Sequence, residues 1–94
     1  MYRGTGLVSW RIVYTSQARK DAKKLAAAGL KAKAEGIIQI LHENPFQTPP
    51  AFEKLVGDLA GAYSRRINIH HRLIYQVMND EQVVKIIRLW THYE

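Results

Sequence analysis

Arginine side chains in the C-terminal half of the chain occur at spacings that suggest a phosphate-binding surface. Side chains alternate between the two faces of a sheet along a strand. This alternation separates Ile67 and Ile69 from Arg66, and it separates Leu73 from Arg72. If the aliphatic side chains face the core, both arginines lie on the open face. There they would form a good phosphate site, because a guanidinium presents a planar fork of donors and keeps its charge. An ordinary solvated polar face explains the same pattern.

Arg65 fits this arrangement less well, since alternation groups it with Ile67 rather than with Arg66. We expect Arg65 to lie at the edge of its strand, with its guanidinium reaching water. In that position its charge would add to an RNA-binding surface.

The histidines indicate no metal site. Adjacent strand residues such as His70 and His71 point to opposite faces and are poorly placed to chelate one ion. His42 is read as a favourable charge near a helix C-terminus. His92 and Tyr93 follow the last expected strand, and strand alternation does not place them. We therefore expect neither a metal nor a cofactor.

Composition favours a small basic domain that binds a polyanion. The chain has 94 residues, which suits one domain, and a formal net charge of +6. It has no cysteine, which excludes disulfides and thiolate metal sites. No apolar run is long enough to span a membrane, and residues 1–9 do not resemble a signal peptide. We therefore expect a cytoplasmic protein.

The N-terminal half is expected to form one strand and a helical hairpin. Residues 10–14 are rich in β-branched and aromatic side chains, which are typical of a strand. Thr15 or Ser16 would cap a helix over residues 17–28, and Gly29 suits the left-handed position that ends it. A second helix over residues 30–43 has an apolar stripe and stops before Pro45.

The C-terminal half is expected to form three strands, over residues 63–69, 72–78 and 82–89, with a turn at residues 79–80. Short connections between successive strands predict an antiparallel meander. The whole chain, residues 1–94, is therefore predicted to be a single α+β domain, with the hairpin on one face of the sheet.

Motifs in this half resemble the YoeB/Txe toxins of type II toxin–antitoxin systems, within the wider RelE group. The similar positions are Asn44-Pro45-Phe46, Glu53, Leu55, Leu59, Gly61, Tyr63-Ser64-Arg65-Arg66-Ile67, His71-Arg72-Leu73-Ile74-Tyr75 and His92-Tyr93. The resemblance implies the RelE-like microbial RNase fold and a ribosome-dependent endoribonuclease that cleaves messenger RNA in the decoding site. It also implies a YefM-like antitoxin that masks the toxin, and it is compatible with a homodimer. Residues 1–9 extend past the usual start of the family.

The resemblance also implies roles for individual residues. Glu53 matches the general base, Arg72 the phosphate-binding arginine, His92 the general acid and Tyr93 the tyrosine that closes the site. Arg66 matches a supporting arginine, and we predict that Arg65, Arg66 and Lys54 bind RNA phosphates. These residue types suit metal-free cleavage by the 2′-hydroxyl, which needs a base, an acid and fixed positive charge.

Three positions depart from the family pattern. Glu94 follows Tyr93, where the family typically ends on tyrosine, and it adds a negative charge near the predicted site. Thr91 and Lys54 stand where tyrosine and proline are more usual. None of these departures removes a predicted catalytic residue.

Three other readings remain open. A ParE-like toxin of the same fold would inhibit DNA gyrase without cleaving RNA, but such toxins lack this set of Glu, Arg and His-Tyr. A plain RNA-binding module would have no use for Glu53, because a carboxylate in an RNA groove repels phosphate. Binding to a membrane surface is disfavoured, since the lysines of the first helix do not oppose a large aromatic apolar face.

Overall fold

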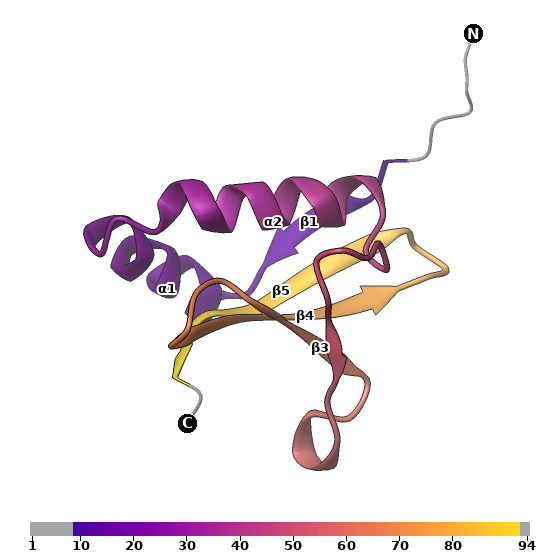
Figure 1. The fold of residues 1–94 in the computed structure, drawn as a ribbon. Coiled ribbons are helices and arrows are strands. Elements are labelled where there is room, and N and C mark those ends of the chain that lie inside the picture. The colour runs from indigo at the N-terminus through magenta and orange to yellow at the C-terminus, as the bar shows by residue number, and fades with distance from the viewer. Residues whose placement is uncertain (1–8, 93–94) are drawn as a thin grey trace, which may run out of the picture.

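Two helices cover one face of a five-stranded sheet in the computed structural model, which describes residues 9–92 and the side chains of residues 9–90 (Figure 1). The helices are α1, Ser16–Ala27, and α2, Lys31–Glu43, and a short 3₁₀ turn, η1, spans Gly57–Leu59. The strands are β1, Arg11–Tyr14, β2, Glu53–Lys54, β3, Ala62–Arg66, β4, His71–Met78, and β5, Val83–His92. The predicted α+β class is therefore confirmed.

The helical hairpin forms where local signals predicted it. Thr15 is the N-cap of α1, and its hydroxyl accepts a hydrogen bond from Ala18 N at 3.0 Å. Gly29 has φ +77°, a left-handed conformation that glycine adopts without steric cost. Ala34 and Leu41 in the stripe of α2 are buried against the sheet.

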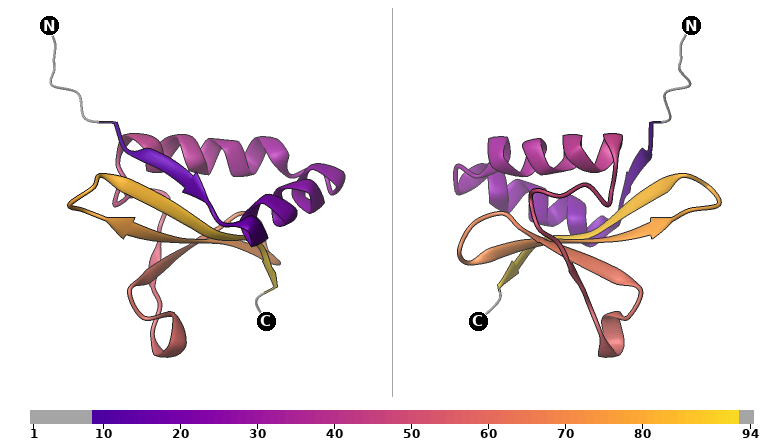
Figure 2. Two further views of the ribbon diagram at one scale, coloured as in Figure 1. Left: turned by 180° about the vertical axis from the view of Figure 1, so that it is seen from behind. Right: turned by 45° about the vertical axis from the view of Figure 1, so that its right-hand side comes forward.

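The predicted meander is confirmed, and it is extended by one strand on each side. The strand order is β1-β5-β4-β3-β2, with β3, β4 and β5 antiparallel. At one edge β1 pairs in parallel with β5, and at the other β2 pairs antiparallel with β3. The short β2 strand was not predicted. It precedes η1, and the hairpin that β2 and β3 form around η1 extends away from the helices (Figure 2).

The first strand of the meander is shorter than predicted. β3 ends at Arg66 instead of Ile69, because the Asn68 side chain accepts hydrogen bonds from His70 N and His71 N and closes a turn. Ile67 is buried as expected, but Ile69 is 76% exposed, so the prediction that it shares a core-facing side with Ile67 is wrong.

Asp21 joins α1 to the end of β5. Its carboxylate is fully buried and accepts hydrogen bonds from Leu89 N, Trp90 N and Arg88 Nε, at 3.0, 3.2 and 2.8 Å. The pairing of β5 with β4 shifts register in this region, and the carboxylate thus satisfies backbone donors where the ladder is irregular. Gln17 donates a further bond to the same carboxylate.

The pKa of Asp21 is held at about 2, below the ordinary value of 3.8. Burial alone would raise the pKa, but the hydrogen bonds from Arg88, Leu89, Gln17 and Trp90 together outweigh it. A depressed pKa means that the ionised group stabilises the fold above about pH 4. This contribution is lost as the pH falls from about 4 toward 2.

Asp21→Asn is therefore expected to lower the free energy of unfolding by about 2 kcal/mol at pH 7. The difference from the wild type should shrink as the pH is lowered toward 3, because the unfolded state then takes up a proton that the folded state does not. Urea unfolding at several pH values measures both effects. Asp58→Asn, in the exposed η1 turn, is the matched control and should cause little change at any pH. A loss that stayed constant with pH would contradict this assignment.

Candidate functional site

A polar hollow of about 290 Å³ opens on the sheet face opposite the helices, where β2, β3 and β4 lie side by side. It is lined by Pro50, Ala51, Glu53, Ser64, Arg66 and Arg72. It holds one carboxylate and two guanidinium groups, and fixed guanidinium groups can stabilise negative charge on a phosphate.

Strand register brings these side chains to one face. Arg66 on β3 pairs directly with Arg72 on β4, and Glu53 on β2 pairs with Ser64 on β3. Directly opposed residues of antiparallel strands share a face. The prediction that Arg66 and Arg72 lie together is therefore confirmed, and Glu53 joins them from a segment that the alternation argument did not include.

Glu53 and Arg72 form an ion pair in this hollow. Arg72 Nη1 donates to Glu53 Oε1 at 2.8 Å, and the two side chains are 14% and 62% exposed. The arginine is thus largely enclosed, while the carboxylate stays open to solvent. An ion pair with one partner so exposed adds little stability.

The prediction that Arg65 reaches water and binds RNA phosphates is wrong. The residue is only 1% exposed, so its guanidinium neither reaches water nor faces an RNA phosphate. Its donors go to the backbone carbonyls of Pro50, Gln47 and Pro45, at 2.7, 2.9 and 3.0 Å, and to Tyr75 Oη at 3.1 Å. The physical reason is that alternation turns Arg65 inward, where the loop after α2 supplies acceptors in place of water.

Tyr75 completes this buried network. Its hydroxyl donates to Pro45 O at 2.9 Å while it accepts from Arg65 Nε. Burial raises the pKa of Tyr75 despite the nearby positive charge of Arg65, so the hydroxyl keeps its proton and remains a donor. Arg65 and Tyr75 together anchor the segment that leads into β2, and this anchoring positions Glu53.

The C-terminal strand includes the backbone of a further predicted residue, His92. β5 runs to His92, beyond the predicted end at Leu89, and the backbone of His92 pairs with His71. Thr91 pairs with Arg72, so the His92 backbone lies one position from the register partner of that arginine. The side chain of His92 and the whole of Tyr93 lie outside the described residues.

The ring of Trp90 stacks on the ring of His71, with centroids 3.9 Å apart and an interplanar angle of 21°. His71 is buried and His70 is exposed, as expected for neighbours that point in opposite directions. Within residues 9–92, no group of three or more His, Cys, Asp or Glu side chains is arranged to hold a metal ion. The described helices include none that is long and apolar enough to cross a membrane.

Lys54 is not brought into the hollow with Glu53. It is exposed on β2 and lines a separate depression together with Leu55, Val56, Gly61, Ala62 and Tyr63. Its predicted contact with RNA phosphates stays a prediction, and it would be made at a distance from the Glu53–Arg72 pair.

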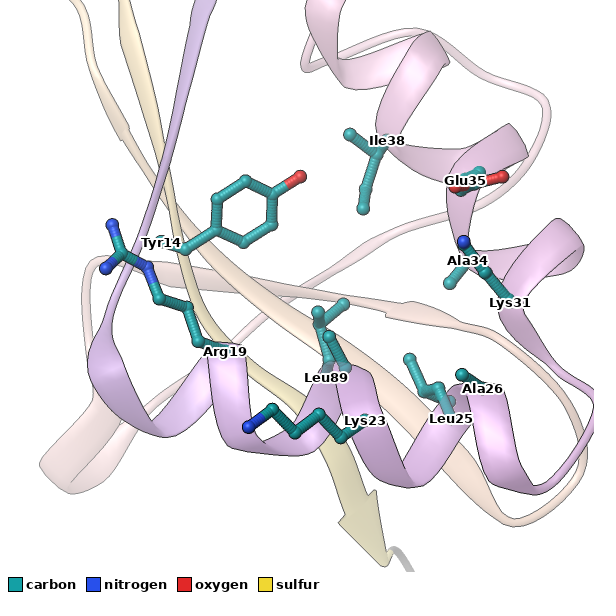
Figure 3. A pocket seen from close by; sticks show the side chains of 11 residues that line it. Tyr14, Arg19, Lys23, Leu25, Ala26, Lys31, Ala34, Glu35, Ile38 and Leu89 are labelled. Atoms are coloured by element: carbon teal, nitrogen blue, oxygen red, sulfur yellow. The ribbon is translucent and has the colours of Figure 1, made fainter.

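A larger hollow of about 430 Å³ lies between the two helices (Figure 3). Its walls include the apolar side chains of Leu25, Ala34, Ile38 and Leu89, with Arg19, Lys23 and Lys31 also in the lining. Burial, and next the charge of Glu35, raise the pKa of Tyr14, so this hydroxyl stays protonated. The Glu53–Arg72 hollow differs from this one in having an acidic and a basic side chain in an ion pair.

Comparison with known proteins gives consistent matches. A family model described as the YoeB-like toxin of bacterial type II toxin–antitoxin systems matches residues 14–93. Toxin YoeB from Streptomyces coelicolor is 34% identical over 85 residues, which cover 88% of this chain and 99% of that protein.

Two solved structures have the same fold. The YoeB/ParE toxin from Agrobacterium tumefaciens superposes with a TM-score of 0.79 at 30% identity, covering 88% of this chain and 99% of that one. A chain of the YoeB-YefM complex from Staphylococcus aureus superposes with a TM-score of 0.75 at 30% identity, covering 92% of this chain and 100% of that one.

Proposed function

Since this chain belongs to the YoeB-like toxins of bacterial type II toxin–antitoxin systems, we propose that it is an endoribonuclease that cleaves messenger RNA in the decoding site of the ribosome. The observation that carries the proposal is the ion pair between Glu53 and Arg72 in a polar hollow opposite the helices. A base and a fixed cation at one site are two of the groups that assist cleavage of a phosphodiester by its own 2′-hydroxyl.

In the proposed reaction, Glu53 removes the proton of the 2′-hydroxyl and the 2′-oxygen attacks the phosphorus. The bond from phosphorus to the 5′-oxygen breaks, and His92 donates a proton to the departing oxygen. The products are a 2′,3′-cyclic phosphate and a 5′-hydroxyl. Arg72 opposes the negative charge that develops on the phosphate oxygens, with Arg66 as a second cation, and Tyr93 closes the site.

The ion pair between Glu53 and Arg72 belongs to the resting state without RNA, and bound RNA must separate the two side chains. A phosphate competes with Glu53 for Arg72, because guanidinium groups bind phosphate and carboxylate in similar geometry. When Arg72 turns to the phosphate, the carboxylate is released to accept the 2′-hydroxyl proton. Binding of substrate thus separates the two groups into their two roles.

We propose that the ribosome holds the messenger RNA in the ordered conformation in which it is cleaved. The hollow is open to solvent on the Glu53 side, so a flexible free strand would have to be ordered there at an entropic cost. We therefore expect efficient cleavage only of ribosome-bound messenger RNA, in the cytoplasm.

The proposal is tested by incubating the protein with bacterial ribosomes that carry an end-labelled messenger RNA, alongside the same RNA without ribosomes. We expect cuts in register with codons in the first reaction only, and cleaved ends that carry a cyclic phosphate. Binding to the ribosome without cleavage would make the chain a non-catalytic inhibitor of translation. Failure to bind ribosomes would favour another target, such as DNA gyrase for a ParE-like toxin.

We also infer that a YefM-like antitoxin neutralises this toxin with an acidic, largely disordered segment that folds across Arg66 and Arg72. Two observations support this inference: the net charge of +6, and the position of Arg66 and Arg72 opposite each other on neighbouring strands of an open face. An acidic disordered segment would complement this charge and fold on binding. A homodimer is compatible with this arrangement and is part of the same proposal.

Arg66→Ala and Arg72→Ala are each expected to weaken antitoxin binding at least about tenfold, because each removes a charge from the contact. The affinity of the wild type should fall as salt is raised. Titration calorimetry at several salt concentrations measures both effects, with Lys20→Ala on the exposed side of α1 as the control of equal charge. A tight affinity that did not change with salt concentration or with either substitution would exclude an acidic segment on this face.

A further inference from the structure

Ser64 is a buried polar residue at the floor of the polar hollow. It is 1% exposed, and its hydroxyl oxygen makes no hydrogen bond to any residue that the structure describes. A buried hydroxyl without a partner costs free energy, which alanine at the same place would avoid. Such a group calls for an explanation at a functional site.

The neighbours of Ser64 identify its natural acceptor. Ser64 pairs with Glu53 on β2 and with Ile74 on β4, so all three side chains share one face. Ile74 is apolar and offers no acceptor, whereas Glu53 carries two carboxylate oxygens. The charged side chains that line the same hollow are Glu53, Arg66 and Arg72, and only the first of these accepts hydrogen bonds.

We propose that Ser64 is a positioning residue that donates a hydrogen bond to the Glu53 carboxylate once a phosphate has drawn Arg72 away. In the resting state Arg72 holds the carboxylate at 2.8 Å. When that contact opens, Glu53 would swing freely, because its side chain is 62% exposed. A bond from the serine below keeps one oxygen fixed and leaves the other directed at the 2′-hydroxyl.

Burial argues for action through Glu53 and against direct contact with RNA. The hydroxyl oxygen of Ser64 has almost no accessible surface, so a phosphate cannot reach it without displacing the side chains above it. The inference rests on the proposed function, since it gives Glu53 the role of base.

The first test measures single-turnover cleavage of ribosome-bound messenger RNA by Ser64→Ala. We expect about a tenfold loss of rate, because a hydrogen bond to a charged group is missing in the reactive state. The midpoint of thermal unfolding should stay equal or rise, since an unpaired buried hydroxyl has been removed. Ser64→Thr keeps the hydroxyl and should retain most of the rate, and Ser16→Ala in the exposed first turn of α1 is the control.

A double substitution separates positioning from general damage. In a Glu53→Gln background, Ser64→Ala should cause little further loss of rate, because the group through which it acts is gone. An undiminished tenfold loss in that background would overturn the inference, as would full activity of Ser64→Ala alone.

A second measurement is independent of ribosomes and of cleavage. Arg72→Ala mimics the state in which the arginine has left Glu53. We expect the carbon-13 chemical shift of Glu53 Cδ at pH 7 to differ between Arg72→Ala and the double variant Arg72→Ala/Ser64→Ala. Identical chemical shifts would contradict the proposed hydrogen bond between Ser64 and Glu53. If the wild type cleaves no RNA but the shifts differ, the proposed function fails while the Ser64–Glu53 contact stands.

Discussion

Glu53→Gln is expected to lower the rate of messenger RNA cleavage on the ribosome by about 100-fold or more, which is the usual contribution of a general base. Glutamine preserves the size of the side chain and one oxygen, so it can still accept a hydrogen bond from Arg72 at the 2.8 Å contact. It cannot take a proton from the 2′-hydroxyl at neutral pH. The loss should therefore appear in the single-turnover rate, while binding of RNA survives or strengthens because a negative charge has gone.

Glu81→Gln is the matched control, since it makes the same change in the exposed turn between β4 and β5. Arg72→Ala should also reduce the rate by about 100-fold or more, through loss of the cation that opposes charge on the phosphate. Retention of activity by Glu53→Gln would remove the base from the mechanism and leave Arg72 as a binding group only.

The second large effect concerns stability. Arg65→Leu is expected to lower the free energy of unfolding by about 3–5 kcal/mol, because several buried acceptors lose a charged donor and each one left unsatisfied costs about 1–3 kcal/mol. Leucine fills part of the space but donates nothing. The carbonyls of Gln47 and Pro50 would lose the donor that satisfies them, whereas Pro45 O would keep its hydrogen bond from Tyr75 Oη, and each unsatisfied buried acceptor is costly. For a domain of this size that loss is a large share of the total stability.

The adjacent Arg66→Leu provides the comparison, because its side chain is exposed in the polar hollow. It should change stability by only about 0.5 kcal/mol, yet it should weaken RNA binding. Urea unfolding of the two variants distinguishes the two arginines. Equal stabilities would mean that the Arg65 network contributes nothing to the folded state.

Local signals in the sequence were sufficient for the helices and for one face of the sheet. Thr15 caps α1, Gly29 ends the turn after it, and Pro45 follows α2, and each acts through its own backbone geometry. Strand alternation brought Arg66 and Arg72 together because their pairing depends only on the short turn between β3 and β4.

The features that the sequence analysis missed depend on partners far along the chain. The acceptors of Arg65 come from the loop after α2, and strand alternation says nothing about that loop. β2 has two residues, too few to show a period. Asp21 reads as one more charge on a lysine-rich helix, although its partners lie 67 to 69 positions away on β5.

The hydrogen bonds of Arg65 also determine which sequence changes the loop before Glu53 should tolerate. The guanidinium donates hydrogen bonds only to main-chain carbonyls of this loop, which every amino acid provides, and its ring contact there is with Phe52, 5.0 Å from the centroid. Side chains at positions such as Thr48, which is exposed, are therefore free to vary. An insertion or deletion between Pro45 and Pro50 would shift the carbonyls out of reach and misplace the base, so we expect the length of this segment to be constrained more tightly than its composition.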